Sequence, residues 1–451
     1  MQNDPKITLI GAGGMSFGPV MVLDAINSPK LRGALMMLHD INAEKLDVVY
    51  NLARRLNEKS GNPIRIERTL DPAVAMTGAH FCLMSTEVGR FPYWKQDYEI
   101  PLQHGATHIT GENGGPGAVF HSLRSIKTCL EICEDIARYC PNTFLINLTN
   151  PMSRVTLAIN AATAIRNVGL CHEFGGGIIR LGLLLRISPR KIKAKASGIN
   201  HFTFFYDIRH AENGADLYPR VRELWKRRYF QYPPAVTKIA KALINVPWLG
   251  IAVEQMHAPL VAHMFREYGL LPASVDSHIG EYVPFAQEVA GWHPVPVEFH
   301  RRLCGRIDKL ATAYGAGRSL LPLHRLGRSG EQAFPIIEAL HTGERAYLDA
   351  VNVPNRGYVP NLPEGAIVEI PAWTGINNLE PEAVPPIHQP LADFMKTQVE
   401  IQDLVVKAAL TRDPAPAFEA LQMDPLSPAD ERRCRKMFDE LLVAQAAALP
   451  F

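Results

Sequence analysis

The sequence of 451 residues lacks the features that mark membrane, secreted and nucleic-acid-binding proteins. It contains no uncharged run near the roughly 20 residues that a membrane-spanning helix needs. Residues 1–6 include acidic and polar residues and form no apolar stretch, so we do not expect a cleaved signal peptide. Lys and Arg number 47 against 45 Asp and Glu, so no overall charge favours a nucleic acid or an anionic membrane as partner.

Cysteine is also scarce, with seven residues that show no paired spacing. Cys129 and Cys133 lie four residues apart on an expected helix, where two small apolar side chains on a buried face explain them. The cysteine pattern therefore excludes a disulfide-stabilised secreted domain and indicates a reducing compartment. We expect a cytoplasmic protein.

Short apolar runs alternate with helical periodicity over the first 200 residues. We predict strands and helices in alternation, with strands over 6–10, 34–39, 79–85, 144–148, 168–171 and 193–199, and helices over 15–26, 41–58 and 120–138. This alternation predicts an α/β fold, built as a Rossmann-like doubly wound parallel sheet of the kind found in lactate and malate dehydrogenases.

The pattern changes after residue 201. Aromatic and proline residues become frequent through 218–248, a mixed-charge helical stretch covers 281–310, and helices return from 387 to the end. A short strand is expected at 367–370. We place a boundary near residue 200, between a dinucleotide-binding domain (1–200) and a C-terminal α+β domain (201–451) that completes the active site and mediates assembly.

A glycine-rich turn joins the first strand to the first helix. Gly11 permits a tight turn, Gly13 and Gly14 let the backbone approach a pyrophosphate, and the following helix offers its N-terminal amides to the anion. Ser16 stands where the strict pattern has a third glycine. Asp40, at the end of the second strand, would accept from ribose hydroxyls and repel a 2′-phosphate, so NAD is favoured over NADP. The alternative is a Rossmann-like turn that binds another nucleotide or none.

Cys171 and His201 each follow a predicted strand. Because the carboxyl ends of parallel strands meet at one edge of a sheet, we expect the two side chains to converge there. By residue type alone, a thiolate and an imidazole suggest zinc or iron more than manganese. Two protein ligands leave positions open for substrate oxygens, as in a catalytic metal site. The alternative is a buried thiol and an unrelated histidine.

Two further polar segments flank these strands. Asn150 follows the strand at 144–148, where its amide suits sugar hydroxyls or caps a turn. Glu112 lies in the glycine-rich loop 110–117, which is either a second anion or substrate cradle or a flexible lid.

The segment 274–282 carries four titratable groups within seven residues. It is either part of an acid–base site or the start of a helix. In the second interpretation Asp276 caps the helix and Glu281 faces solvent.

Taken together, the motifs resemble glycoside hydrolase family 4, the NAD- and divalent-metal-dependent glycosidases. Cys171-His172-Glu173 followed by Gly198-Ile199-Asn200-His201 is the most specific part of the resemblance, and the glycine turn is the least. The remaining matching segments are 100–105, 115–117, 147–151, 281–282 and 353–358.

The resemblance implies glycoside cleavage by elimination and addition. NAD would oxidise the sugar 3-hydroxyl, a base would remove the C2 proton, the C1 leaving group would depart, water would add, and the hydride would return. A metal, manganese in most such enzymes, would be held by Cys171 and His201. Tyr282 is the expected C2 base, with Asp276 as the competing choice. His172 would be the proton donor.

The resemblance also bears on the sugar. Asn150 and Asn200 would contact it, and Glu112 is a further candidate although Gly111 replaces the glutamine that often precedes that loop's acidic residue. His172 stands where the family's phosphosugar branches have aspartate or asparagine. The chain is therefore similar to the branch that acts on unphosphorylated α-galactosides, α-glucosides or α-uronides.

Several questions stay open at this level. A uronate would need an arginine partner, for which Arg90, Arg154 and Arg266 are candidates. A net NAD-dependent oxidoreductase acting on a sugar or 2-hydroxy acid is the alternative function, and a non-catalytic dinucleotide sensor is a third.

The C-terminal helices carry apolar stripes that either cover the sheet or form subunit contacts. The resemblance favours a homodimer or homotetramer. The stripes comprise Leu404, Val405, Ala408, Leu410, Met437, Leu441 and Leu442.

Overall fold

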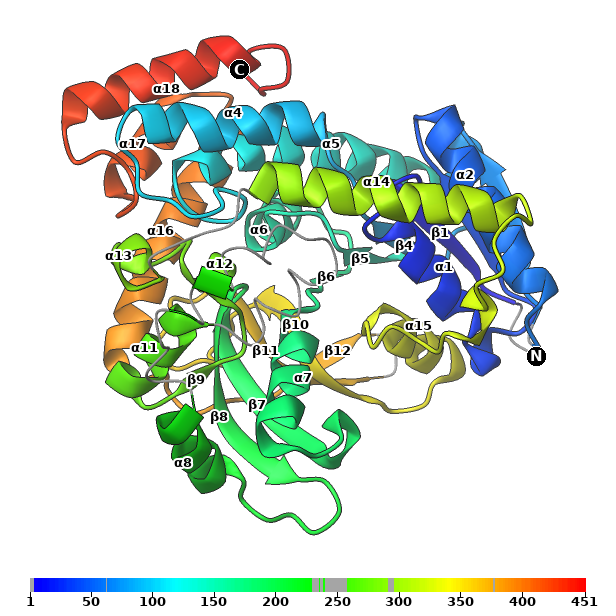
Figure 1. Cartoon of the computed structure of the whole chain (residues 1–451). Helices are drawn as coiled ribbons and strands as arrows, with labels where there is room; N and C mark the ends of the chain where they lie inside the picture. Colours follow the sequence, from blue (N-terminus) through cyan, green and yellow to red (C-terminus); the bar gives the residue numbers. More distant parts are fainter. Residues whose placement is uncertain are drawn as a thin grey trace.

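The N-terminal part of the chain forms a parallel sheet (Figure 1). In this computed structural model the described residues are 4–61, 63–228, 258–290, 296–375 and 378–451, with 235, 238 and 239. The strand order β3-β2-β1-β4-β5-β6, parallel throughout, confirms the predicted doubly wound fold. The strands are β1 (Lys6–Ile10), β2 (Leu35–His39), β3 (Arg65–Thr69), β4 (Phe81–Met84), β5 (Phe144–Asn147) and β6 (Asn167–Gly169).

Helices cover both faces of this sheet because its strands are apolar on both sides. In β4, Phe81 and Leu83 pack in one core with α1 and α2, while Cys82 and Met84 pack in the other with α5 and α6. The helices of the described residues are α1 (Gly18–Ile26), α2 (Ala43–Glu58), α3 (Pro72–Met76), α4 (Arg90–Gln103), α5 (Pro116–Tyr139), α6 (Met152–Ala162), α7 (Glu173–Leu185), α8 (Tyr218–Arg228), α11 (Pro259–Tyr268), α12 (Asp276–Ile279), α13 (Ala286–Ala290), α14 (Pro296–Gly315), α15 (Ala333–Thr342), α16 (Gln389–Thr411), α17 (Ala415–Met423) and α18 (Glu431–Gln445).

Strand β3 was not predicted from the sequence. Its residues Arg65, Glu67 and Arg68 interrupt any apolar run, and most of the strand is exposed. An edge strand can be polar because one side of it has no neighbouring strand and faces solvent. The expected helix at 15–26 also begins later, at Gly18, because residues 15–17 form a turn.

The sheet continues beyond β6 with antiparallel strands in the order β10-β11-β7-β8-β9. The expectation that 193–199 belongs to the parallel series is wrong. β7 returns directly into β8 through the turn at Asn200 and His201, and a turn this short can only join antiparallel strands. The strands are β7 (Ile192–Ile199), β8 (Phe202–His210), β9 (Leu271–Pro272), β10 (Tyr347–Pro354), β11 (Ile367–Thr374) and β12 (Leu379–Pro381).

The boundary predicted at residue 200 falls inside this β7–β8 hairpin, and the sheet is continuous across it. The division into two domains therefore stays a prediction. Of the expected helical stretch 281–310, the described residues form α13 and α14, and residues 291–295 lie outside them. Most of the aromatic stretch 218–248 after α8 also lies outside the described residues.

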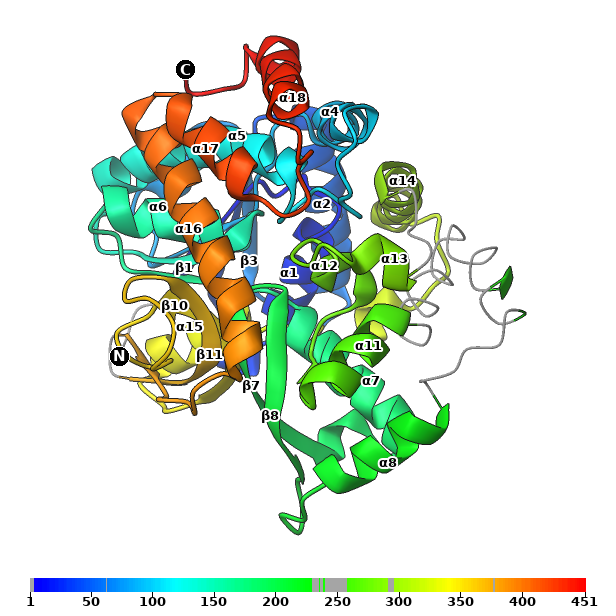
Figure 2. The same cartoon turned by 90° about the vertical axis from the view of Figure 1, so that its left-hand side faces the viewer.

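The C-terminal helices pack on the helices of the sheet's second face, with α16 against α5 and α6 (Figure 2). Val405 and Ala408 of α16 and Met437 and Leu441 of α18 are fully buried in the core that contains α5 and α6. The apolar stripes are thus explained by packing within one chain, and Leu410 is the stripe member left substantially exposed. In the described part of the chain, no helix combines the length and apolarity required to cross a membrane.

Helix α1 packs closely on the glycine turn at Gly18. A Cβ atom on Gly18 would lie 2.1 Å from the carbonyl oxygen of Ala12, which belongs to the backbone and cannot move away freely. We expect Gly18→Ala to lower the free energy of unfolding by about 1–3 kcal/mol, measured by urea denaturation. Gly175→Ala in α7 is the matched control, because nothing lies within 4 Å of its added Cβ. Equal stability of the two variants would contradict this packing.

Candidate active site

The glycine turn after β1 is held by the acid predicted to bind ribose. Gly11 has φ +82°, and a Cβ there would lie 2.0 Å from the carbonyl oxygen of Ser85. The amide of Gly13 donates to Asp40 Oδ2 at 2.8 Å, and the amide of Asn42 donates to Oδ1 at 2.8 Å. The structure thus brings the predicted glycines and the carboxylate into one compact turn, in which the absence of a Cβ lets Gly11 pack on Ser85 and lets Gly13 pack on Asp40 and Lys45.

Gly18, and not the residue at position 16, provides the close approach between helix and turn. Ser16 is exposed, whereas Gly18 packs on Ala12. The first turn of α1 has fewer amides free to bind an anion than the sequence predicted. The Gly18 amide donates to the Gly14 carbonyl oxygen at 2.8 Å, and Pro19 has no N–H.

Cys171 and His201 meet as predicted. The sulfur of Cys171 lies 3.5 Å from Nε2 of His201. The reason differs from the prediction, because β7 is antiparallel to its neighbour β11 and does not share a carboxyl edge with β6. The ends of β6 and β7 meet through a row of paired residues that crosses β10 and β11 between Gly169 and Gly198.

His201 occupies a strained position. It is the second residue of the β7–β8 turn and has φ 114°, a region that residues with a Cβ rarely adopt. Such a conformation costs on the order of 1–3 kcal/mol and persists only where the surroundings hold it. Here the Tyr282 hydroxyl donates to the carbonyl oxygen of Asn200 at 2.9 Å, next to the strained residue.

Glu369 joins this turn to the middle of the sheet. Its Oε2 accepts from the Asn200 amide at 2.9 Å and from the Asn352 amide at 3.2 Å. Burial raises the pKa of Glu369 to about 7, against the effect of the two amides. The sequence analysis missed Glu369, although a single acid inside the apolar run 367–370 is a usable signal. The Asn200 amide, predicted to contact sugar, is bound to this carboxylate.

Glu281 connects His201 to the glycine-rich loop 110–117. Its Oε1 accepts from the amides of Glu112 and Asn113 at 2.7 and 2.9 Å, and its Oε2 lies 3.7 Å from Nδ1 of His201. The expectation that Glu281 faces solvent is wrong, because the loop encloses it completely. The loop is buried and not a flexible lid, and these two amides hold an internal carboxylate. A carboxylate behind a histidine typically orients a metal-binding imidazole.

Glu173 and His278 complete the polar cluster. The rings of His201 and His278 are stacked with centroids 4.1 Å apart, and Nδ1 of His278 lies 2.7 Å from Oε1 of Glu173. Ligand atoms of Glu173, His201 and His278 all lie within 4.8 Å of one another. The sequence analysis named neither Glu173 nor His278 as a ligand, because their approach depends on helices α7 and α12, which are far apart in the chain.

The cluster fits a divalent cation. A separation of 3.5 Å between sulfur and nitrogen suits two ligands that each bind one ion at about 2.0–2.3 Å. Burial, and then His278, lower the pKa of His201, which favours the neutral imidazole that binds metals. Burial together with Glu173 and Glu369 raises the pKa of Cys171 well above its usual value. A cation beside the sulfur would favour the thiolate.

Two of the three residues predicted to bind sugar, Asn150 and Glu112, lie next to each other, and the Glu112 amide donates to Glu281. The Asn150 amide is 3.4 Å from Oε1 of Glu112, and a guanidinium nitrogen of Arg90 is 3.5 Å from the same oxygen. Burial alone would raise the pKa of Glu112, but Arg90 and nearby histidines lower it to about 2. Glu112 is therefore a charged acceptor at neutral pH, suited to hydroxyl groups.

The three predicted acid–base residues differ in their surroundings. Tyr282 is 3% exposed and lies on the His201 turn. Asp276 directs both carboxylate oxygens to the amides of Leu260 and Val261, at 2.9 and 2.8 Å, and so caps α11 instead of its own helix. The side chain of His172 is 62% exposed at the start of α7.

Comparison with known proteins decides the family. A model described as "Family 4 glycosyl hydrolase" matches residues 6–182, and one for the family's C-terminal domain matches residues 196–427. The chain belongs to glycosyl hydrolase family 4. The resemblance inferred from the motifs is confirmed, and the protein is a glycoside hydrolase.

Curated relatives and a solved structure cover nearly the whole chain. An alpha-glucosidase of Erwinia rhapontici is 32% identical over 442 residues, 93% of each chain. An alpha-galactosidase of Rhizobium meliloti (strain 1021) is 29% identical and covers 99% of this chain and 89% of its own. The fold matches a 6-phospho-alpha-glucosidase from gut microorganisms, solved with NAD and Mn2+, with a TM-score of 0.84, 21% identity and 99% of both chains covered.

Removing the Glu281 carboxylate tests the connection between the loop and His201. Glu281→Ala leaves two buried amides without an acceptor, so we expect the free energy of unfolding to fall by about 2–6 kcal/mol, measured by denaturant titration. Glu281→Gln is the control, because its carbonyl oxygen can still accept from both amides while the charge facing His201 is lost. Wild-type stability of Glu281→Ala would contradict the described contacts.

Proposed function

We propose that this family 4 enzyme cleaves unphosphorylated α-glycosides with the help of NAD and a divalent metal, Mn²⁺ being the expected ion. The observation that supports it most is the pair of Cys171 and His201, 3.5 Å apart, in the sheet that carries the dinucleotide turn. The names of the two relatives, an alpha-glucosidase and an alpha-galactosidase, agree with this substrate class.

The chain's residues have distinct tasks in this proposal. NAD would accept a hydride from sugar C3 and return it, and the metal would polarise the neighbouring sugar oxygens. Cys171 and His201 would hold the metal, with Glu281 orienting the imidazole. The proposed dinucleotide site is the turn after β1 with the acid that holds it, and comprises Gly11, Gly13, Gly14, Ser16 and Asp40.

Tyr282 is the proposed base for the C2 proton, on the ground of its position beside the His201 turn. Burial and then Glu281 raise its pKa well above 10, while Arg154 acts in the opposite direction. Tyr282 would therefore act as a base only as the phenolate, which needs a cation nearby. The metal ion held by Cys171 and His201 would be that cation. Asp276 is the weaker candidate because both of its oxygens cap α11. His172, exposed at the start of α7, is the proposed proton donor.

The charge balance favours a neutral hexoside over a uronide. Arg90 is already paired with Glu87 and Glu112. Arg266 is exposed on α11 and pairs with Glu267. Asn150 and Glu112 then serve the hydroxyl groups, and Asn200, whose side-chain nitrogen donates to Glu369, can contribute its oxygen.

The third arginine forms no ion pair with a carboxylate among the described residues. Arg154 is 1% exposed, and its Nε and Nη2 atoms have no hydrogen-bond partner in the described part of the chain. Burial lowers its pKa, while the charges of Tyr282, Asp424 and Glu281 act in the opposite direction. The preference for a neutral hexoside therefore rests on the pairing of Arg90 and Arg266, and Arg154 is the arginine that a uronate carboxylate would need.

We further propose a homodimer or homotetramer in the cytoplasm. This part of the proposal rests on the family resemblance and on the cysteine pattern, since the C-terminal apolar stripes pack within the chain.

A panel of nitrophenyl α-glucosides, α-galactosides and α-galacturonides, assayed with NAD, Mn²⁺ and a thiol reductant, tests substrate and reaction together. We expect turnover of a neutral α-hexoside without accumulation of NADH, because the hydride returns in every cycle. In deuterated water the product should carry deuterium at C2, detected by mass spectrometry. Stoichiometric NADH would instead indicate a net oxidoreductase, and retention of the original C2 hydrogen would exclude the proposed mechanism.

The metal assignment has its own test. We expect Cys171→Ser to weaken Mn²⁺ binding by at least about tenfold in isothermal titration calorimetry, because a hydroxyl is a poorer ligand than a thiolate. Cys304→Ser is the control, since this partly exposed cysteine lies on α14 and outside the cluster. Equal Mn²⁺ affinity of Cys171→Ser and the control would reject the sulfur as a ligand.

A further inference from the structure

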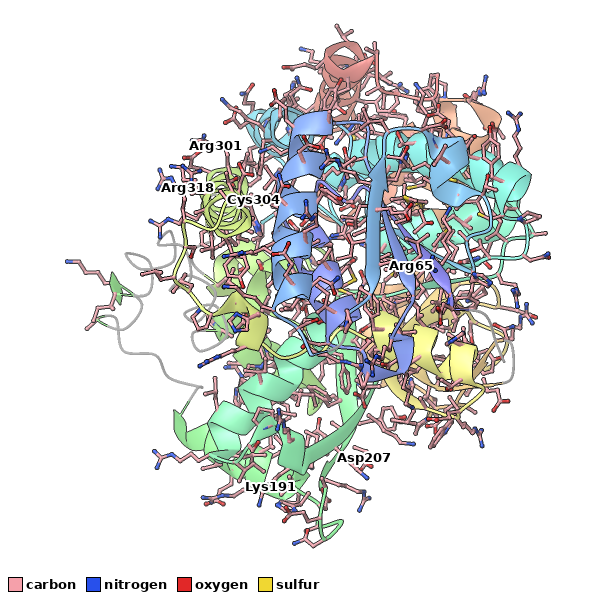
Figure 3. The ribbon with its side chains drawn as sticks, turned by 90° about the vertical axis from the view of Figure 1, so that its right-hand side faces the viewer. Arg65, Lys191, Asp207, Arg301, Cys304 and Arg318 are labelled. Carbon is pink, nitrogen blue, oxygen red and sulfur yellow. The ribbon has the colours of Figure 1, made fainter. Side chains whose placement is uncertain are left out.

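Helix α14 packs across α2, on the side of the fold that carries the glycine turn. Figure 3 shows it nearly end-on beside α2, with Cys304 labelled on it. The sulfur of Cys304 is 3.9 Å from the Ser16 hydroxyl oxygen, and Asp308 Oδ2 is 2.9 Å from Nζ of Lys45. A segment that lies 288 residues after the glycine turn, counted from Ser16 to Cys304, therefore contributes polar groups beside it.

Lys45 stands at the ribose end of this turn. It lies in the first turn of α2, where its amide donates to Asn42 Oδ1 at 3.0 Å. A Cβ atom on Gly13 would lie 2.7 Å from the Lys45 Cβ and 2.9 Å from Asp40 Oδ2. The stem of the lysine and the ribose-binding carboxylate thus contact the same glycine.

A cation at this place would normally favour the wrong coenzyme. In dinucleotide-binding folds an acid after the second strand accepts from the ribose 2′-hydroxyl, and a nearby basic side chain accommodates a 2′-phosphate. Lys45 is within reach of that role. Its ammonium is instead paired with Asp308, whose other oxygen is buried and has no hydrogen-bond partner among the described residues.

We propose that Asp308 is a specificity-determining residue of the dinucleotide site. By pairing with Lys45 it withholds a cation that would otherwise attract a 2′-phosphate. Two carboxylates then favour NAD, which has a free 2′-hydroxyl, over NADP: Asp40 within the turn and Asp308 on α14. This inference rests on the proposed binding of NAD.

Binding of the oxidised coenzymes, measured by calorimetry without substrate, tests the inference. We expect Asp308→Asn to strengthen NADP binding about three- to fivefold, the gain from one partly exposed ion pair, and to change NAD binding less than about twofold. Lys45→Gln should weaken NADP binding, because Asp308 is then unpaired. In the double variant Asp308→Asn/Lys45→Gln, the gain in NADP affinity should disappear.

The control is Glu212→Gln, which breaks an exposed ion pair with Lys191 at the far end of the β7–β8 hairpin (Figure 3). This variant should leave the ratio of NADP to NAD affinity unchanged. An unchanged ratio in Asp308→Asn, or a gain that persists in the double variant, would overturn the inference. Wild-type protein that binds neither coenzyme would overturn the proposed function itself, so the two failures are distinguishable.

Discussion

The site depends on the interactions of one buried carboxylate, that of Glu281. One of its oxygens accepts two loop amides and the other faces the imidazole of His201. A buried charge is tolerated only when hydrogen bonds and opposite charge replace its water, and here loop 110–117 provides the hydrogen bonds. The same contacts fix the loop that carries Glu112. A single side chain thus positions His201, the proposed metal ligand, and Glu112, a proposed sugar-binding residue, together.

The sheet explains how distant segments reach one site. Its parallel part delivers the dinucleotide turn, β6 and Cys171, as a doubly wound fold does. Its antiparallel part delivers the β7–β8 turn with His201, through the row of pairs that crosses β10 and β11. Asn352 and Glu369 lie on this row, so the buried hydrogen bonds that support the turn are part of the sheet itself.

The sequence was sufficient for features that depend on local pattern. The strand, glycine turn, helix and Asp40 follow one another within 40 residues, and their spacing alone predicts the dinucleotide site. The motifs that contain Cys171 and His201 resemble those of the family, and this resemblance predicted that the two residues form a pair. The pairing of β7 with β11, the burial of Glu281 and the hydrogen bonds of Glu369 could not be predicted in this way, although the single acid in the apolar run 367–370 draws attention to Glu369 itself. Each depends on a partner far along the chain, such as the 169 residues that separate Glu281 from Glu112.

The turn at His201 has a consequence for how this protein can change. A histidine at φ 114° is less stable there than glycine, which adopts positive φ at little cost. In the proposed function the imidazole at this position binds the metal, so the turn gives up folding stability for a ligand. Glycine at position 201 would relieve the backbone strain and remove the proposed ligand in the same step.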